Sequence, residues 1–271
     1  MFGEIANSDY EGEISDMGDK VQIRVRPDIQ IRKYERGQEL DIQVPEANKI
    51  TLTIDHADYF NVLCDDVDEV QSDIDKMNEF TDDATEQMQI SIDSEILADI
   101  YTDADEDNAG TSAGKQSGNI DLGEASAPVE VTSDNAIDKI VDMGTVLDEQ
   151  NIPQQGRWVV LPPAIVARIK KSDLKDASLA GDGTSILRNG RVGMIDRFTV
   201  YSSNNLERDS DDDAWNCVFG HSAGLTYASQ IAQTEQVKSE KYFGYFIRGL
   251  NVFGYKVTNP EAIGHFYASV G

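Results

Sequence analysis

A long apolar stripe at helical spacing constrains the fold of this chain more than any other feature. Between residues 67 and 100, apolar side chains recur every three or four positions, which is typical of one helix, or of two helices nearly in line with a break at Thr81. The other faces are almost wholly acidic, since residues 65–107 hold 17 acidic side chains and one basic side chain. We therefore predict a helix over about residues 67–102 with a single apolar face. The stripe consists of Val67, Val70, Ile74, Met77, Phe80, Ala84, Met88, Ile92, Ile96 and Ile100.

A second pattern, alternation of apolar and polar side chains, runs through residues 20–55. Such alternation is typical of half-buried antiparallel strands, and its breaks carry turn residues at Pro27-Asp28 and around Gly37. We predict a long hairpin or a small meander, apolar on one face and polar to basic on the other. A two-stranded hairpin is not stable alone, so its apolar face must pack on another surface. The apolar positions are Val21, Ile23, Val25, Ile29, Ile31, Leu40, Ile42, Val44, Ile50, Leu52 and Ile54.

The rest of the chain mixes helices and strands without an internal repeat or a regular alternation, which indicates an α+β fold. Residues 103–128 are rich in Asp, Gly, Ser and Ala and predict a surface loop. Helical spacing follows Ser133 and, again, Pro162-Pro163. Strands are expected at residues 157–161, 192–201, 215–219, 242–258 and 263–270.

The 271 residues carry a formal charge of −27, from 50 acidic and 23 basic side chains. This balance excludes most nucleic-acid binders that act through a basic surface, and it argues against an anionic membrane as partner. No apolar run approaches the ~20 residues that span a bilayer. The N-terminal segment lacks the basic start and apolar core of a signal peptide. We expect a soluble protein with no membrane association.

The run Gly220-His-Ser222-Ala-Gly224 fits the G-x-S-x-G nucleophile elbow, in which a strand-to-helix turn exposes the serine. An apolar strand precedes it, and residues 225–233 could be helical. A hydrolase also needs a downstream acid and histidine, but only glutamates and His265 follow, and no glycine-rich oxyanion loop stands upstream. We interpret the motif as a tight turn beside a strand. A serine hydrolase that uses Ser222 is the alternative.

Two aspartate clusters, at residues 103–107 and 209–213, resemble the opening of a calcium-binding loop. Neither has glycine at the sixth position or glutamate at the twelfth. A cation-dependent surface module is therefore a second alternative. The three histidines, His56, His221 and His265, lie far apart with no Cys or His at metal-ligand spacing. We expect no catalytic residue, no metal site and no cofactor.

The order of the parts is more informative than any single motif: a hairpin, an acidic helix, a second α/β lobe and aromatic C-terminal strands. Several short phrases accompany this order: FGEIAN at residues 2–7, DYEGEI at 9–14, GDKV at 18–21, GRWVVLPP at 156–163, the run at 190–200 and GHSAGLTYASQ at 220–230. Through them the chain resembles, over nearly its full length, the major capsid proteins of tailed phages and related archaeal viruses. That family has the Hong Kong 97-type coat fold.

The resemblance implies a division of the chain. Residues 1–12 would be an N-terminal arm, shorter than is usual in the family, and residues 13–55 would be the extended β-hairpin loop. Residues 56–132 would form the peripheral domain, with the acidic helix as its spine. Residues 133–233 would form the axial domain, and residues 234–271 would return as strands to the peripheral domain.

The resemblance also implies a structural protein without chemistry of its own. Its copies would assemble as pentamers and hexamers into an icosahedral head around viral double-stranded DNA, which a separate motor packs. Scaffold, portal and decoration proteins would be further partners. The protein would reside in the virion, and in the host cytoplasm during assembly.

The charge pattern suggests how copies meet. The basic face of the hairpin has no large partner within the hairpin, and Lys76 alone offsets the acidic helix. We hypothesise that the hairpin of one subunit lies over the acidic helix of a neighbour, which gives self-complementarity and sets register. Burial of the basic residues within the same subunit is the alternative. The residues of this contact would be Arg24, Arg26, Arg32, Lys33 and Arg36 with Asp82, Asp83, Glu86 and Asp93.

The acidic excess further predicts a virus of a salt-loving host, such as a haloarchaeon. A charge of −27 repels itself strongly in dilute buffer, whereas the screening length falls to ~3 Å in molar salt. The same salt would weaken exposed pairing between hairpin and helix, so the two hypotheses oppose each other.

Overall fold

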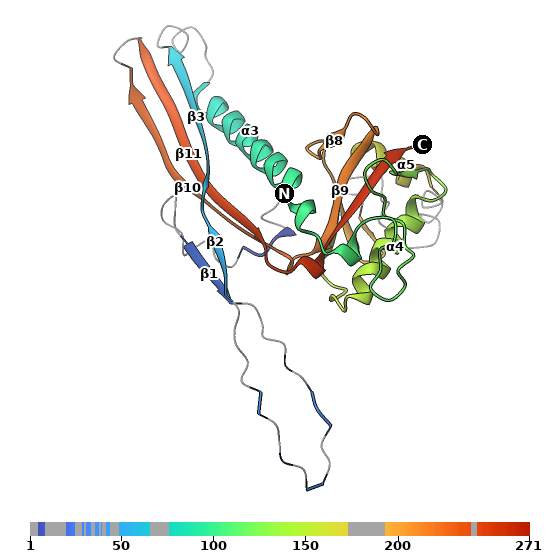
Figure 1. Ribbon diagram of the computed structural model, residues 1–271. Helices are drawn as coiled ribbons and strands as arrows, with labels where there is room; N and C mark the ends of the chain where they lie inside the picture. Colours follow the sequence, from blue (N-terminus) through green and yellow to red (C-terminus); the bar gives the residue numbers. More distant parts are fainter. Residues whose placement is uncertain are drawn as a thin grey trace, which may run out of the picture.

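The computed structural model arranges the described residues around two larger β-sheets that a helix connects, with a two-stranded sheet beside them (Figure 1). It describes residues 5–8, 20–24, 29, 31–33, 36–37, 39, 42–43, 49–65, 76–172, 193–239 and 243–271. Helix α3 (Lys76–Asp99) lies along a long three-stranded sheet, and helices α4 (Ala136–Glu149) and α5 (Pro163–Lys171) flank a seven-stranded sheet. The expected mixture of helices and strands in an α+β fold is confirmed.

The three-stranded sheet is antiparallel and has long edges. Its edge strands are β3 (His56–Asp65) and β10 (Leu225–Lys238), and β11 (Gly244–Val257) runs between them. A β-bulge between Ile231 and Gln233 interrupts the pairing of β10 with β11.

Helix α3 packs on this unit through the apolar stripe that its sequence predicts. Ile96 and Leu97 have no exposed surface. The helix runs unbroken through Thr81, so the interpretation as one helix holds over its described length. The expected start, at residues 67–75, lies outside the described residues. Within the described ranges, no helix combines the length and the apolar character needed to cross a bilayer.

Among the described residues of the expected hairpin, paired strands form at its base. β1 (Lys20–Arg24) pairs antiparallel with β2 (Lys49–Thr53). Their apolar faces join one residue each from β10 and β11 in a small separate core. Its members are Val21, Ile23, Leu52, Ile54, Ala228 and Val252.

The described residues between β1 and β2 form no strand, although the alternation predicts strands through Ile29, Ile31 and Ile42. These three side chains are 64%, 93% and 89% exposed. Alternation indicates a segment with one apolar face, but a stable strand also needs a paired backbone and a covering surface. The described part of this single chain supplies neither to these residues. Val25, Leu40 and Val44 lie outside the described residues.

The second sheet contains seven strands: β4 (Val129–Val131), β5 (Arg157–Leu161), β6 (Met194–Ile195), β7 (Phe198–Ser202), β8 (Arg208–Asp209), β9 (Ala214–His221) and β12 (Ile263–Val270). Their order is β4-β12-β9-β5-β7-β6, with β8 paired to β9. β12 pairs parallel with β4, and β5 parallel with β7. Every residue of β5 is buried, as expected for a central strand covered on both faces.

The C-terminal strands divide between the two sheets, whereas we expected residues 234–271 to return together to the peripheral domain. β11 lies in the three-stranded sheet beside β3, but β12 pairs with β9 and β4 in the seven-stranded sheet. The expected boundary at residue 233 also falls within β10. Alternation identifies strands but does not encode their partners, which explains both differences.

The buried guanidinium of Arg157 fixes helix α4 to strand β5. It donates to the carbonyl oxygens of Gly144, Ile152 and Pro153 at 3.1, 2.7 and 3.0 Å, and to Asp148 Oδ1 at 2.6 Å. Gly144 lies within α4, and Ile152 and Pro153 lie in the segment between α4 and β5. One side chain with no exposed surface therefore satisfies four acceptors.

Replacing Arg157 with methionine should lower the free energy of unfolding by about 3–5 kcal/mol, because buried acceptors lose their donors. Arg197→Met is a matched control, since Arg197 is 42% exposed and lies 3.8 Å from the other oxygen of the same Asp148. It should cost less than about 1 kcal/mol. Urea denaturation followed by tryptophan fluorescence measures both losses. Equal losses would contradict the capping role of Arg157.

Candidate functional site

Acidic side chains of α3 gather on one exposed face of the helix. Asp82, Glu86 and Asp93 are spaced by four and seven residues, which places them within about 40° of one another around the helix axis. Asp82 and Glu86 are exposed, and Asp93 is half-buried. We call these three residues the acidic face.

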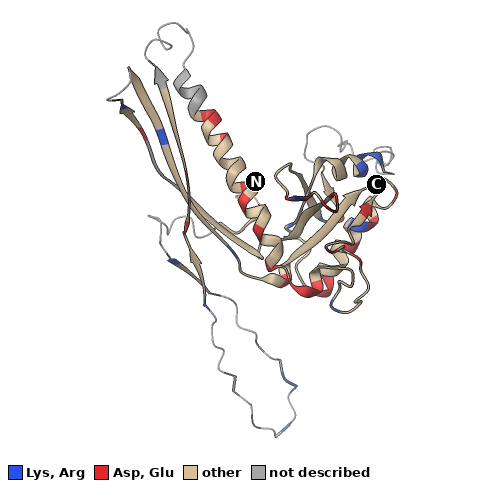
Figure 2. Cartoon of the chain, turned by 45° about the horizontal axis from the view of Figure 1, so that its top comes forward, with Lys and Arg blue, Asp and Glu red and all other residues tan. Residues whose placement is uncertain are grey.

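The buried apolar residues of α3 lie farther along the helix, toward its C-terminal end. Ile92, Ile96 and Leu97 are buried there, whereas Asp82 and Glu86 lie in preceding turns whose side chains are all exposed or half-buried. The sequence of α3 holds seven acidic residues and one basic residue. Figure 2 shows acidic positions along the described helix without basic ones between them. The sequence of α3 itself therefore carries a large acidic excess.

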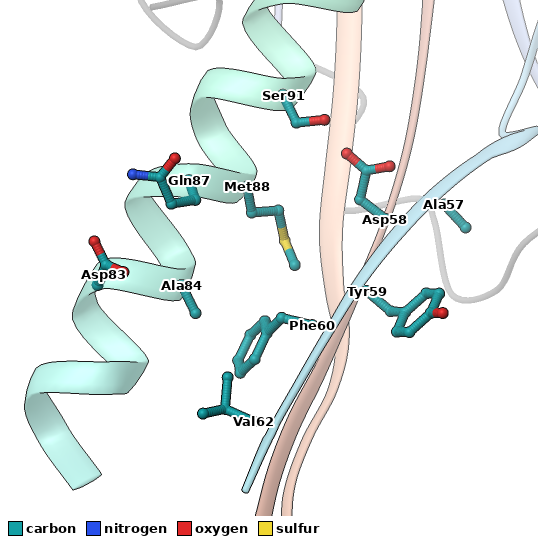
Figure 3. Close-up of a pocket in the computed structure, with 10 residues that line it drawn as sticks. All are labelled: Ala57, Asp58, Tyr59, Phe60, Val62, Asp83, Ala84, Gln87, Met88 and Ser91. Atoms are coloured by element: carbon teal, nitrogen blue, oxygen red, sulfur yellow. The ribbon is translucent and has the colours of Figure 1, made fainter. Parts of the chain in front are cut away.

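A groove of about 580 Å³ lies between α3 and β3 (Figure 3). It is apolar where Phe60 and Val62 of β3 face Ala84 and Met88 of α3. Asp83, the fourth acidic candidate, therefore lines the groove and is turned away from the acidic face. The polar residues that line it are Asp58, Asp83, Gln87 and Ser91.

Gly249 of β11 makes room for the ring of Phe60. A Cβ atom at this position would lie 2.3 Å from Phe60 Cε1, too close for any side chain. A glycine inside a strand often marks such a close approach. The absence of a side chain lets the ring pack against the sheet and complete the apolar lining.

The basic candidates lie on the hairpin, away from the acidic face. Arg32, Lys33 and Arg36 are exposed, which does not support their burial within the same subunit. Arg24 belongs to β1, but its side chain is not described, and Arg26 lies outside the described residues. Figures 1 and 2 both show the described pieces of the hairpin loop beyond the β1–β2 base, far from α3. One chain alone therefore does not bring the described basic candidates to the acidic ones.

Sequence reasoning missed the groove, because the groove depends on how β3 and α3 pack in space. The available signal was the alternation within β3, where Asp58, Phe60 and Val62 share the face that lines the groove. Sequence reasoning predicts that the apolar face of the hairpin needs a covering surface. It did not predict that Ile29, Ile31 and Ile42 are exposed in the single chain.

The motif around Ser222 forms a turn between two strands. β9 ends at His221 and β10 begins at Leu225, so the helix considered for residues 225–233 is wrong and the strand-to-helix elbow is not formed. The ring of His221 bonds to the backbone on both sides, with Nε2 2.8 Å from the Gln155 carbonyl oxygen and Nδ1 accepting from the Ala223 amide. Burial lowers the pKa of His221. The structure matches the interpretation as a tight turn.

Carboxylates of both aspartate clusters already accept hydrogen bonds, within their own segments and from distant parts of the chain. Asp105 Oδ1 accepts from the Asp107 amide and from Gln150 Nε2. The hydroxyl of Tyr267 lies 3.1 Å from Asp209 Oδ2 and 2.9 Å from Asp212 Oδ2. Burial and these two carboxylates raise the pKa of Tyr267. Among the described residues, no group of three or more His, Cys, Asp or Glu side chains is arranged to hold a metal ion.

Comparison with known proteins identifies relatives of the fold. A sequence model of the family described as phage capsid protein matches residues 59–265. The structure of Mycobacterium phage Che8 is similar with a TM-score of 0.71 and 24% identity, over 98% of this chain and 90% of that chain. The capsid of Ralstonia phage GP4 is similar with a TM-score of 0.67 and 13% identity, over 99% of this chain and 91% of that chain. The mature capsid of bacteriophage PhiM1 is similar with a TM-score of 0.63 and 18% identity, over 97% of this chain and 87% of that chain. No curated protein matches the sequence significantly.

Neutralising the acidic face should leave folding intact. The double variant Asp82→Asn, Glu86→Gln should change the free energy of unfolding by less than about 0.5 kcal/mol, because both side chains are exposed. Ile96→Ala, on the buried side of the same helix, should cost about 2–5 kcal/mol. Urea denaturation followed by circular dichroism measures both. A loss above about 1 kcal/mol in the double variant would assign the acidic face a role in folding.

Proposed function

This chain belongs to the phage capsid protein family and is a coat protein of the virion, and we propose that its copies assemble as pentamers and hexamers into an icosahedral head shell around double-stranded DNA. The Hong Kong 97-type fold shared with phage structures supports this geometry. Scaffold, portal and decoration proteins are the further partners that such a shell implies. The function then lies in surfaces that meet other copies.

One observation carries the proposed contact between copies: the acidic face and the basic hairpin residues are exposed at separate places on one chain. Opposite charges that cannot meet within a subunit can meet between subunits. Because every copy presents both surfaces, the contact repeats around a ring, as closed assemblies require. Charge complementarity of this kind selects the partner and fixes the register. The hairpin of one subunit therefore lies over α3 of its neighbour.

The exposed isoleucines of the hairpin support the same contact. Ile29, Ile31 and Ile42 are left uncovered by the described part of their own chain. Burying one such side chain fully contributes about 1.5–3 kcal/mol. The groove between α3 and β3 offers an apolar lining of matching character, on the side of the neighbour's helix about 160° from the acidic face. Hydrophobic burial supplies most of the affinity, and the charges supply selectivity.

An acidic coat suits a container for DNA. Phosphate binding needs clustered Lys and Arg, whereas this chain has 50 acidic and 23 basic side chains. A wall with this charge does not hold the genome tightly, so the DNA remains free to be packed and released. Packing is then the task of a separate motor.

The same excess supports a virus of a salt-loving host, in which strong salt screens repulsion between subunits that each carry a charge of −27. Pairs that are exposed lose strength in such salt, while contacts that are partly buried are screened less. A contact that combines buried isoleucines with flanking charges is compatible with strong salt and still keeps the charge pairing between hairpin and helix.

Reversing the hairpin charges should impair assembly. In the triple variant Arg32→Glu, Lys33→Glu, Arg36→Glu the assembled fraction should fall at least about tenfold, because the loss of three exposed pairs of about 0.5 kcal/mol each weakens every contact by about 1.5 kcal/mol, to which repulsion adds. Sedimentation velocity and negative-stain electron microscopy measure the fraction. The charge-conserving control Arg32→Lys, Lys33→Arg, Arg36→Lys should form normal shells. Adding Asp82→Lys and Glu86→Lys, both on the acidic face, to the reversed hairpin should restore assembly. Normal shells from the reversed variant alone would refute the contact.

Salt should govern the durability of the shell. Particles are expected to remain intact in about 1 M salt and to dissociate or swell at about 10 mM, because the screening length rises from ~3 to ~30 Å. Light scattering during dialysis, with microscopy of the end points, measures this change. Particles that last equally well in both buffers would remove the argument for a salt-loving host.

A further inference from the structure

The connection between the hairpin base and the three-stranded sheet is a tightly packed joint. β2 ends at Thr53 and β3 begins at His56, and the intervening Ile54 has no exposed surface. The backbone of β11 touches the joint at Gly254, where a Cβ atom would lie 2.4 Å from the Thr53 carbonyl oxygen. Any side chain at Gly254 would push the joint away from the sheet. The direction of the hairpin is therefore set here.

His56 stands at this joint between two carboxylates. Its Nδ1 lies 2.6 Å from Glu95 Oε1 of α3, and its Nε2 lies 3.2 Å from Asp55 Oδ1 of the joint itself. The ring stacks on Phe253 of β11, with centroids 5.2 Å apart, and lies 5.3 Å from the ring of Tyr255. The imidazole thus connects the joint, α3 and β11 in one cluster.

The other titratable groups that face His56 carry negative charge or none. They are Asp55 from the joint, Glu95 and Asp99 from α3, and Tyr255 from β11. The hydroxyl of Tyr255 donates to Asp99 Oδ2 at 3.0 Å, and burial, this bond and the nearby carboxylates raise the pKa of Tyr255. Within the described residues, the ion pairs of Asp55 and Glu95 involve only His56. The positive charge of this cluster therefore has to come from the imidazole.

The two contacts of His56 require a doubly protonated ring. An imidazolium has two N–H donors, whereas a neutral imidazole has one donor and one acceptor, so one carboxylate loses its donor when the ring loses a proton. Histidine is the side chain that ordinarily changes charge between about pH 5 and 8. We propose that His56 is a protonation-dependent latch that holds the hairpin base against α3 and loosens when the imidazole becomes neutral. The latch strengthens the joint at the acidic end of this range and weakens as the pH rises.

Hydrogen exchange of the full-length, unassembled chain tests the latch. Exchange of the amides in β1 and β2, corrected for the intrinsic effect of pH, is measured by mass spectrometry at pH 5.5 and 8.5. Local opening should be about two- to fivefold more frequent at pH 8.5, as expected for the loss of one partly exposed charged contact. His56→Gln, which cannot carry the charge, should open equally at both pH values. Glu95→Gln should also reduce the difference, and it provides a second test if His56→Gln does not fold.

His221→Gln is the matched control, because His221 is the last residue of β9, in the seven-stranded sheet, and the joint belongs to the strands of other sheets. It should keep the full pH dependence of β1 and β2. A joint that opens equally at both pH values in the unmodified chain, or a pH dependence that persists in His56→Gln, would overturn the latch. The measurement needs no shell, so a failure of the proposed assembly contact leaves its outcome unaffected.

Discussion

The packing of α3 on the three-stranded sheet determines where the other surfaces of this protein lie. Ile92, Ile96 and Leu97 are buried, and each fully buried side chain of this size contributes about 1.5–3 kcal/mol. A helix has a fixed period, so burying one stripe fixes the direction of every other residue. The groove beside β3 remains where the smaller Ala84 cannot fill the space.

The end of the same helix ties the two sheets together. The short 3-10 turn η2 (Ile100–Asp103) follows α3 and carries Tyr101, whose ring stacks 4.8 Å from that of His265 on β12. The hydroxyl of Tyr101 donates to Glu207 Oε2 at 2.8 Å. Burial, with Glu207, raises the pKa of Tyr101 to about 12, and burial lowers that of His265 to about 4. Both rings are neutral near neutral pH, so neither ring brings a charge to this connection.

Much of the fold follows from periodicity in the sequence, because periodicity reports which side of an element is buried. The strands expected at residues 157–161 and 263–270 coincide with β5 and β12, and the acidic helix lies where its stripe indicates. Periodicity contains no information on partners, so the sheet that β12 joins could not be inferred. The direction in which each acidic side chain of the candidate site points could not be inferred either. Asp83 follows Asp82 directly, yet one residue turns a helix by about 100° and carries Asp83 to the groove.

The bulge in β10 has a consequence for a protein made in many copies. β10 is a 14-residue edge strand, and a long regular edge invites another chain to add to the sheet. The bulge between Ile231 and Gln233 breaks the even spacing of backbone donors and acceptors that such addition requires. The charged Glu235 and Lys238 follow on the outer half of the strand. Subunits that joined such open-ended sheets would no longer be available for shell assembly. An irregular edge therefore keeps subunits free to form closed shells.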